Sequence, residues 1–205
     1  DDCLNASKHI SISGESVYAY SSSNDGIDSN GTISISGGIV VCSGTTTPEE
    51  GIDCDSNTFT VTGGTIIGIG GASSTPTASG TTQPVIIYGG SGSAGTYIAL
   101  NAADGTNILS YKIPRAYNQM TLLVSSPSLS KGSTYTLQSG GSISGGTTFH
   151  GLTTGGTWSG GSQLTSASLS STVTTINVSG GGQGGGGGQP GGQPGGGGKP
   201  GGGRP

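Results

Sequence analysis

The sequence predicts an all-β protein that begins with a short right-handed parallel β-helix, and three observations support this fold class. A repeat of about 23 to 26 residues runs through the first third of the chain, and such a period is typical of solenoids. Within each repeat, apolar residues alternate with Ser or Thr, as expected for a half-buried strand. Each alternating run ends at glycine, where the backbone turns at little steric cost.

The repeats form three units, residues 2–24, 25–49 and 50–71, and each is predicted to be one coil. In each unit a first strand leads into a glycine corner and then into a second, shorter strand. The first strands carry Ile10 and Ile12, Ile33 and Ile35, and Phe59 and Val61. The corners are Gly14, Gly37–Gly38 and Gly63–Gly64, and the second strands carry Val17 and Ala19, Val40 and Cys42, and Ile66 and Gly68. Stacking in register would bury these columns.

The pattern changes after the third unit. Residues 72–83 are polar and without periodicity, which indicates a loop. Residues 84–178 contain apolar-alternating runs, and the pair Asp104–Gly105 between two of them is a hairpin signal. We expect an antiparallel β-unit that caps the last coil, because an open coil would leave unpaired edge groups and an uncovered core.

The chain ends in a Gly/Pro-rich tail, residues 179–205. One interpretation is a flexible linker, which is common for glycine-rich segments. The spaced prolines favour the other interpretation, an extended polyproline-II-like segment in which glycine permits close lateral packing. We expect the extended form, held by another surface.

Composition and charge exclude several classes of function. Gly contributes 45 of 205 residues, charged residues 8 % and aromatic residues 5 %, so thin β-layers suit this chain better than a thick aromatic core. The acidic residues concentrate in positions 1–55, with a net charge of −8 there and +4 in the remainder. Nucleic acid is a poor partner for such a chain. There is no apolar run long enough to span a membrane and no visible signal peptide, so we expect a processed extracellular or cell-surface protein.

The acidic residues fall into columns when the units are aligned. One column holds Asp2, Asp25 and Glu50, and a second holds Asn5, Asp28 and Asp53, with Asp55 nearby. Stacked strands lie about 4.8 Å apart, so the carboxylates must be solvated, protonated or bridged. Oxygen ligands of this kind suit Ca²⁺, which predicts calcium at Asn5, Asp25, Asp28, Asp53 and Asp55. The alternative is a solvated acidic ridge. The EF-hand pattern fails, because Thr58 stands where that loop needs Gly.

Hydroxyl side chains and tyrosines form the second candidate site. The outward rows of the first strands are His9, Ser11 and Ser13, then Thr32, Ser34 and Ser36, then Thr58, Thr60 and Thr62. Tyr18 and Tyr20 lie two residues apart on the neighbouring face, where their rings could stack on sugars. We predict carbohydrate contacts from Tyr18, Tyr20, Thr58, Thr60 and Thr62. An ice-like water layer and a plain polar surface are the alternatives.

No catalytic constellation emerges from the sequence, so we expect a non-enzymatic protein. His9 and His150 lie in different units with no partner at a usable spacing, and Lys8 is a weak candidate for a lyase base. Cys42 is expected to be a small buried thiol. Cys3 and Cys54 could pair across coils, although three cysteines are too few for a disulfide framework.

The phrases DGIDSNGTISISGG at residues 25–38, EGIDCD at residues 50–55 and the Tyr18-Ala-Tyr20 segment resemble a bacterial family of extracellular carbohydrate-binding β-helix proteins with a pectate-lyase-like fold. The similarity spans about residues 1–130. It implies bound calcium at Asp25, Asp28, Asp53 and Asp55, with Asn5 at the matching uncharged position. It also implies affinity for cellulose or acidic polysaccharides without lyase activity. The Gly/Pro-rich tail departs from this family.

Two functions follow as hypotheses. In the first, the uncapped initial coil and the tail join copies of the chain head to tail into fibres, with polysaccharide binding as an accompanying activity. In the second, the chain is a monomeric carbohydrate-binding module with a flexible tail. We expect the first.

Overall fold

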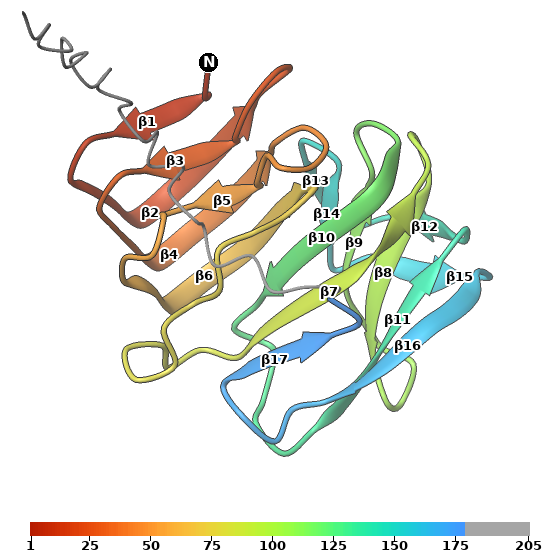
Figure 1. The fold of residues 1–205 in the computed structure, drawn as a ribbon. Helices are drawn as coiled ribbons and strands as arrows, with labels where there is room; N and C mark the ends of the chain where they lie inside the picture. Colours follow the sequence, from red (N-terminus) through yellow and green to blue (C-terminus); the bar gives the residue numbers. More distant parts are fainter. Residues whose placement is uncertain (179–205) are drawn as a thin grey trace, which may run out of the picture.

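Figure 1 shows the computed structural model, which describes residues 1–178. Seventeen strands and no helix make up the secondary structure of these residues, which confirms the predicted all-β class. The described part of the chain accordingly offers no long apolar helix that could cross a membrane. The predicted polyproline-II-like tail, residues 179–205, lies outside the described residues.

The three predicted units lie side by side through parallel pairing of their long strands (Figure 1). These strands are β2 (His9–Tyr20), β4 (Thr32–Ser43) and β6 (Phe59–Gly70), each of 12 residues. The apolar columns are in register, for Ile10 pairs with Ile33 and Ile33 with Phe59. Short strands of the same units form a second parallel sheet, β1 (Leu4–Ala6), β3 (Ile27–Ser29) and β5 (Ile52–Asp53).

Each long strand bends at the predicted corner. The pairing register shifts there, and one residue of each strand adopts a positive φ, 60° at Glu15, 87° at Gly38 and 95° at Gly64. The second and third units use glycine at this position, where the left-handed conformation is free of Cβ strain. The first unit uses Glu15 instead.

The sheet of long strands continues beyond the third unit. Strand β10 (Tyr117–Ser125) pairs antiparallel with β6, β7 (Val85–Gly92) pairs antiparallel with β10, and β17 (Val173–Ile176) pairs parallel with β7. The order is β17-β7-β10-β6-β4-β2. We call this six-stranded layer the long sheet. The predicted boundary near residue 84 therefore lies within one sheet, and the loop 72–83 runs along β5 and β6 through hydrogen bonds such as Ser74 N–H to the Ile52 carbonyl (2.8 Å).

A second six-stranded sheet packs on the long sheet. Its order is β13-β14-β9-β8-β11-β16. The strands are β8 (Tyr97–Ala102), β9 (Asn107–Lys112), β11 (Thr134–Ser139), β13 (Thr147–Phe149), β14 (Leu152–Thr154) and β16 (Ser162–Ser168). The predicted hairpin at Asp104–Gly105 joins β8 to β9, and Gly105 has a φ of 87°. A small ribbon pairs β12 (Ser142–Ser144) with β15 (Thr157–Ser159).

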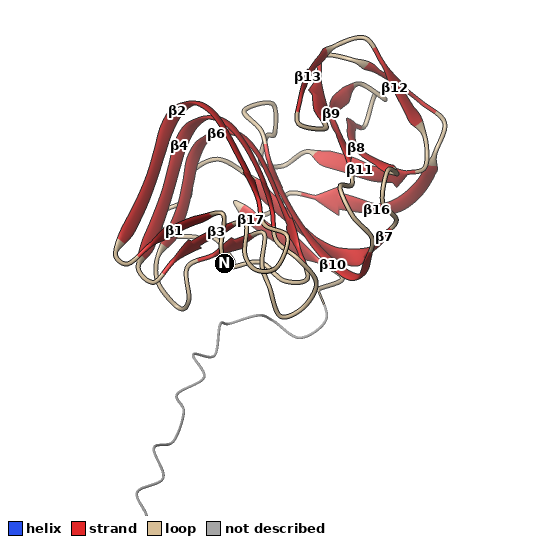
Figure 2. Cartoon of the chain, turned by 90° about the horizontal axis from the view of Figure 1, so that it is seen from above, coloured by secondary structure: helices blue, strands red, loops and turns tan. Residues whose placement is uncertain are grey.

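Two hydrophobic clusters fill the fold, one on each face of the long sheet. The inner cluster lies within the three units and includes Val40, Cys42 and Ile66. The outer cluster lies between the two six-stranded sheets and includes Val41 and Ile67. Neighbouring residues of a strand face opposite sides of the sheet, so β4 and β6 contribute side chains to both clusters. Figure 2 shows β2, β4 and β6 curving over the short strands on one side, with β8, β9 and β11 on the other.

Candidate functional site

The predicted acidic columns come together along the sheet of short strands. Parallel pairing places Asn5, Asp28 and Asp53 in one row. The Asn5 side-chain amide donates to Asp2 Oδ2 (2.8 Å) and to Asp28 Oδ2 (2.6 Å). Asp25 accepts a hydrogen bond from the Glu50 backbone N–H. Each unit therefore makes a polar side-chain contact with the next unit.

We call Asn5, Asp25, Asp28, Glu50 and Asp53 the acidic corner, and burial raises the pKa of three of its carboxyl groups, Asp25, Asp28 and Glu50. Desolvation raises the pKa of Asp25 to about 7, and nearby Asp53, Glu49 and Asp2 add like-charge repulsion. Desolvation also raises the pKa of Glu50 to about 8. Glu50 is 6 % exposed, and its Oε2 atom is buried without a hydrogen-bond partner. A buried carboxylate oxygen without a partner is costly, which favours the protonated form, although hydrogen bonds from Ser74 act in the opposite direction.

The acidic corner is where the sequence predicted calcium. Within residues 1–178, no three acidic, histidine or cysteine side chains gather closely enough to hold a metal ion. Asp53 already accepts hydrogen bonds from the Asp55 N–H (2.8 Å) and the Ser74 hydroxyl (3.2 Å). Calcium at Asn5, Asp25, Asp28, Asp53 and Asp55 stays a prediction.

An aromatic and basic cluster surrounds the two predicted tyrosines. The Tyr18 ring stacks on His150 with centroids 3.7 Å apart, and the Tyr18 and Tyr20 centroids are 6.5 Å apart. The Arg115 guanidinium lies 4.3 Å from the Tyr20 centroid, a cation–π distance, and it also donates to the Ser21 carbonyl. We call Tyr18, Tyr20, Arg115 and His150 the aromatic cluster. The contributions of Arg115 and His150 were missed from the sequence, because they come from the distant second half of the chain.

The threonine row is separate from this cluster. Thr58, Thr60 and Thr62 stand before the β6 corner, whereas Tyr18 and Tyr20 stand after the β2 corner, with β4 between the two strands. A Cβ built on Gly80 would lie 2.6 Å from the Thr60 methyl carbon, so the loop 72–83 covers part of this row. The five predicted carbohydrate residues therefore do not form a single site.

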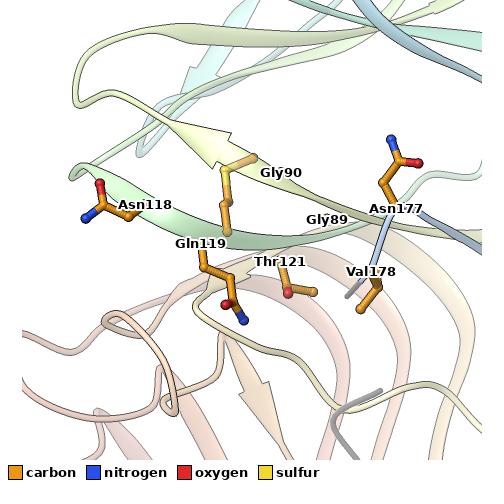
Figure 3. Close-up of a pocket in the computed structure, with 8 residues that line it drawn as sticks. Gly89, Gly90, Asn118, Gln119, Thr121, Asn177 and Val178 are labelled. Carbon is orange, nitrogen blue, oxygen red and sulfur yellow. The ribbon is translucent and has the colours of Figure 1, made fainter. Parts of the chain in front are cut away.

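A polar groove that the sequence did not indicate lies between β7, β10 and the end of β17 (Figure 3). Its volume is about 240 Å³, and its lining residues are Gly89, Gly90, Asn118, Gln119, Met120, Thr121, Asn177 and Val178. Gly89 and Gly90 contribute no side chain to the groove, and the side-chain amides of the Asn and Gln residues supply hydrogen-bond donors and acceptors. Such a lining suits an extended peptide or sugar hydroxyls. None of the described residues that line it is charged.

Exposed apolar side chains gather at the sheet edges. In the described part of the chain, four large hydrophobic residues are exposed: Leu4 (39 %), Tyr18 (41 %), Tyr20 (39 %) and Leu164 (36 %). They belong to β1, β2 and β16, and each of these is the last strand of its sheet. Large apolar groups at unpaired edges mark candidate interaction surfaces.

The cysteines and histidines take separate places. All three cysteines are free thiols, with Cys3 exposed and Cys42 and Cys54 buried. The buried thiol predicted for Cys42 is confirmed, and Cys3 and Cys54 are not joined. His9 contacts the Thr32 hydroxyl (2.5 Å), far from the stacked His150.

Comparison of the chain with protein-family models, with characterised proteins and with solved structures found no match.

Proposed function

We propose that this chain is an extracellular, non-enzymatic structural protein that assembles into fibres. Its first three units are the coils of a short right-handed parallel β-helix, and the remaining strands cap the far end. The edge of the first coil and the Gly/Pro-rich tail join one copy to the next. The observation that carries the proposal is the edge of strand β2, which no further described strand covers.

Strand β2 has the properties of an edge made for pairing. It is 12 residues long and pairs only with β4 among the described strands. Proline, short length and covering loops normally protect such edges. Strand β2 contains no proline, and it presents the exposed rings of Tyr18 and Tyr20.

The two edge strands of the long sheet differ in length, with 12 residues in β2 and four in β17, and the two parts of the sequence differ in charge. Residues 1–55 carry a net charge of −8, and the remainder carries +4. Unlike ends favour head-to-tail contact over symmetric pairing, and a head-to-tail contact that does not close into a ring produces a filament.

Imaging by negative-stain electron microscopy tests this proposal. The full chain is compared with a chain ending at Val178, each with calcium and with a chelator. We expect filaments from the full chain and isolated particles from the shortened one. Isolated particles from the full chain under every condition would rule out assembly. Filaments that need calcium would support the calcium prediction at the acidic corner.

Polysaccharide binding is the second proposed function, supported by the exposed aromatic cluster. Its rings and the Arg115 guanidinium offer a stacking surface and hydrogen-bond donors to a sugar chain. The monomeric binding module remains the alternative to the fibre.

Retention on cellulose and pectin tests binding. We expect the double variant Tyr18→Ala/Tyr20→Ala to lose retention and Tyr97→Ala, a tyrosine on β8, to keep it. Equal retention of both variants would remove the aromatic cluster from the proposal.

A further inference from the structure

Among the described strands, the long sheet ends at β2 and at β17, and these two edge strands run in the same direction. Strands β2, β4 and β6 are mutually parallel. Strand β10 reverses the direction, β7 reverses it again, and β17 is parallel to β7. The edge strand β17 therefore runs parallel to the edge strand β2 at the far side (Figure 1).

The residues of the two edges also occupy the same rows. From Val17, the pairing passes without a register shift through Val40, Ile66, Ser125 and Val85 to Val173. The next three rows run from Tyr18 to Thr174, from Ala19 to Thr175 and from Tyr20 to Ile176. Strand β17 thus ends the sheet in the same rows as the second half of β2.

Side chains in matching rows face the same cluster. Val17 and Val173 both pack against the inner cluster. Ile176 packs against the outer cluster, and its row partners Ile69 and Tyr88 belong to that cluster. A strand added beside β17 in this register would continue both apolar faces. A slip of one residue would exchange them.

The backbone amides that point outward from β17 and from β2 alternate in a way that allows the two edges to hydrogen-bond to each other. The Val85 N–H donates to the Thr172 carbonyl (2.8 Å), so in a parallel ladder the amides of Val173 and Thr175 point away from β7. The Ser21 N–H donates to the Ser43 carbonyl (2.9 Å), so by the same alternation the amides of Tyr18 and Tyr20 point away from β4. In a parallel pair, each outward residue bonds to the two residues that flank its row partner. Tyr18 opposite Thr174 meets this requirement.

We propose that the partner of the β2 edge is the β17 edge of a second copy, paired in parallel with Thr174 opposite Tyr18. This inference rests on the proposed fibre and specifies its strand contact, to which the tail adds the second contact that the fibre requires. The six-stranded sheet then repeats without interruption along the filament. With strands about 4.8 Å apart, one copy advances the filament by about 29 Å.

The other exposed apolar groups lie at the same two ends. In Figure 1, β16 lies at the same end of the molecule as β17, and β1 lies at the same end as β2. Leu164 on β16 and Leu4 on β1 are exposed there, and both would approach the neighbouring copy. A two-fold contact between two β2 edges would instead be antiparallel and would stop at a dimer.

A proline substitution tests the β17 edge. In Thr175→Pro the lost amide is the outward one, so the fold and the pairing with β7 remain while the edge loses a donor and gains a bulky ring. We expect the concentration needed for filaments to rise about tenfold or more, with an unchanged circular dichroism spectrum. Thr175→Val, which keeps the amide, is the matched control. Filaments of Thr175→Pro that form as readily as those of the control would overturn the inference.

Disulfide trapping tests the register independently. In a Cys3→Ser background, Tyr18→Cys combined with Thr174→Cys places two thiols on adjacent strands, within the Cα separation of about 4.4–6.8 Å that a disulfide accepts. We expect a ladder of covalent oligomers after oxidation of the filaments, and at most dimers from either single variant. Filaments that form without a ladder would overturn the inference and leave the proposed fibre standing. A full chain that forms no filaments at all would overturn both.

Discussion

At the scale of single residues, the corners of the long strands depend on glycine. Gly38 has a φ of 87°, and a Cβ built there would lie 2.4 Å from the Glu15 carbonyl oxygen. Gly14 precedes the same corner in the first unit, and a Cβ there would meet nothing within 4 Å. The two positions differ because Gly38 is covered by β2, whereas Gly14 lies on the open edge.

We therefore expect Gly38→Ala to lower the free energy of unfolding by about 2 kcal/mol or more, because it combines a left-handed φ with a backbone clash. Gly14→Ala should change it by less than about 1 kcal/mol. Urea denaturation below the concentration at which filaments form measures both. Equal losses in the two variants would contradict the geometry of the corner.

At the scale of elements, the acidic corner makes the stability of the short strands depend on pH. The pKa of Asp25 rises from 3.8 to about 7 and that of Glu50 from 4.5 to about 8 in the folded chain, mainly through burial. At a pH between its unfolded and folded pKa values, each carboxyl binds more protons in the folded chain, so unfolding releases protons. Their stabilising contribution is complete below about pH 4 and is lost as the pH rises through 7 and 8.

We expect the free energy of unfolding to fall between pH 5 and pH 8 by more than about 1.4 kcal/mol, the equivalent of one pKa unit. The double variant Asp25→Asn/Glu50→Gln should flatten this dependence. Asp104→Asn is the control, because Asp104 is fully exposed on the β8–β9 turn. Urea midpoints across this pH range provide the measurement, and a stability that rises with pH would reverse the assignment.

At the scale of the whole molecule, the long sheet joins the three units to the second half of the chain. Leu123 lies on β10 yet is fully buried in the inner cluster of the units. The outer cluster likewise combines Val41 and Ile67 with residues of the second six-stranded sheet. Because both clusters share β4, β6, β7 and β10, the two halves should unfold together.

We expect one cooperative transition for residues 1–178. Trp158, the one tryptophan of the chain, reports on the β12–β15 ribbon, and far-ultraviolet circular dichroism reports on all strands. Their thermal midpoints should coincide. Leu123→Ala should lower both by the same amount, at a cost of about 2–5 kcal/mol, whereas exposed Leu164→Ala should leave both nearly unchanged. Separate midpoints would show that the halves fold independently.

The sequence by itself determined the long strands of the three units, their corners and the rows that pair between them, whereas the short strands β1, β3 and β5 were not predicted. These features are local: alternation decides which side of a strand is buried, and glycine decides where the strand can bend. The acidic row of Asn5, Asp28 and Asp53 followed from the same repeat.

Only the tertiary structure decided what meets across long separations. It brought Arg115 and His150 onto Tyr20 and Tyr18, covered part of the Thr60 row with the loop near Gly80, and placed β17 in line with β2. Such contacts depend on the order of strands in the sheets, and strand order is set by how the two apolar clusters close. Both clusters pack on the long sheet at the same time, one on each face, and no local pattern in the sequence predicts which distant strands they bring together.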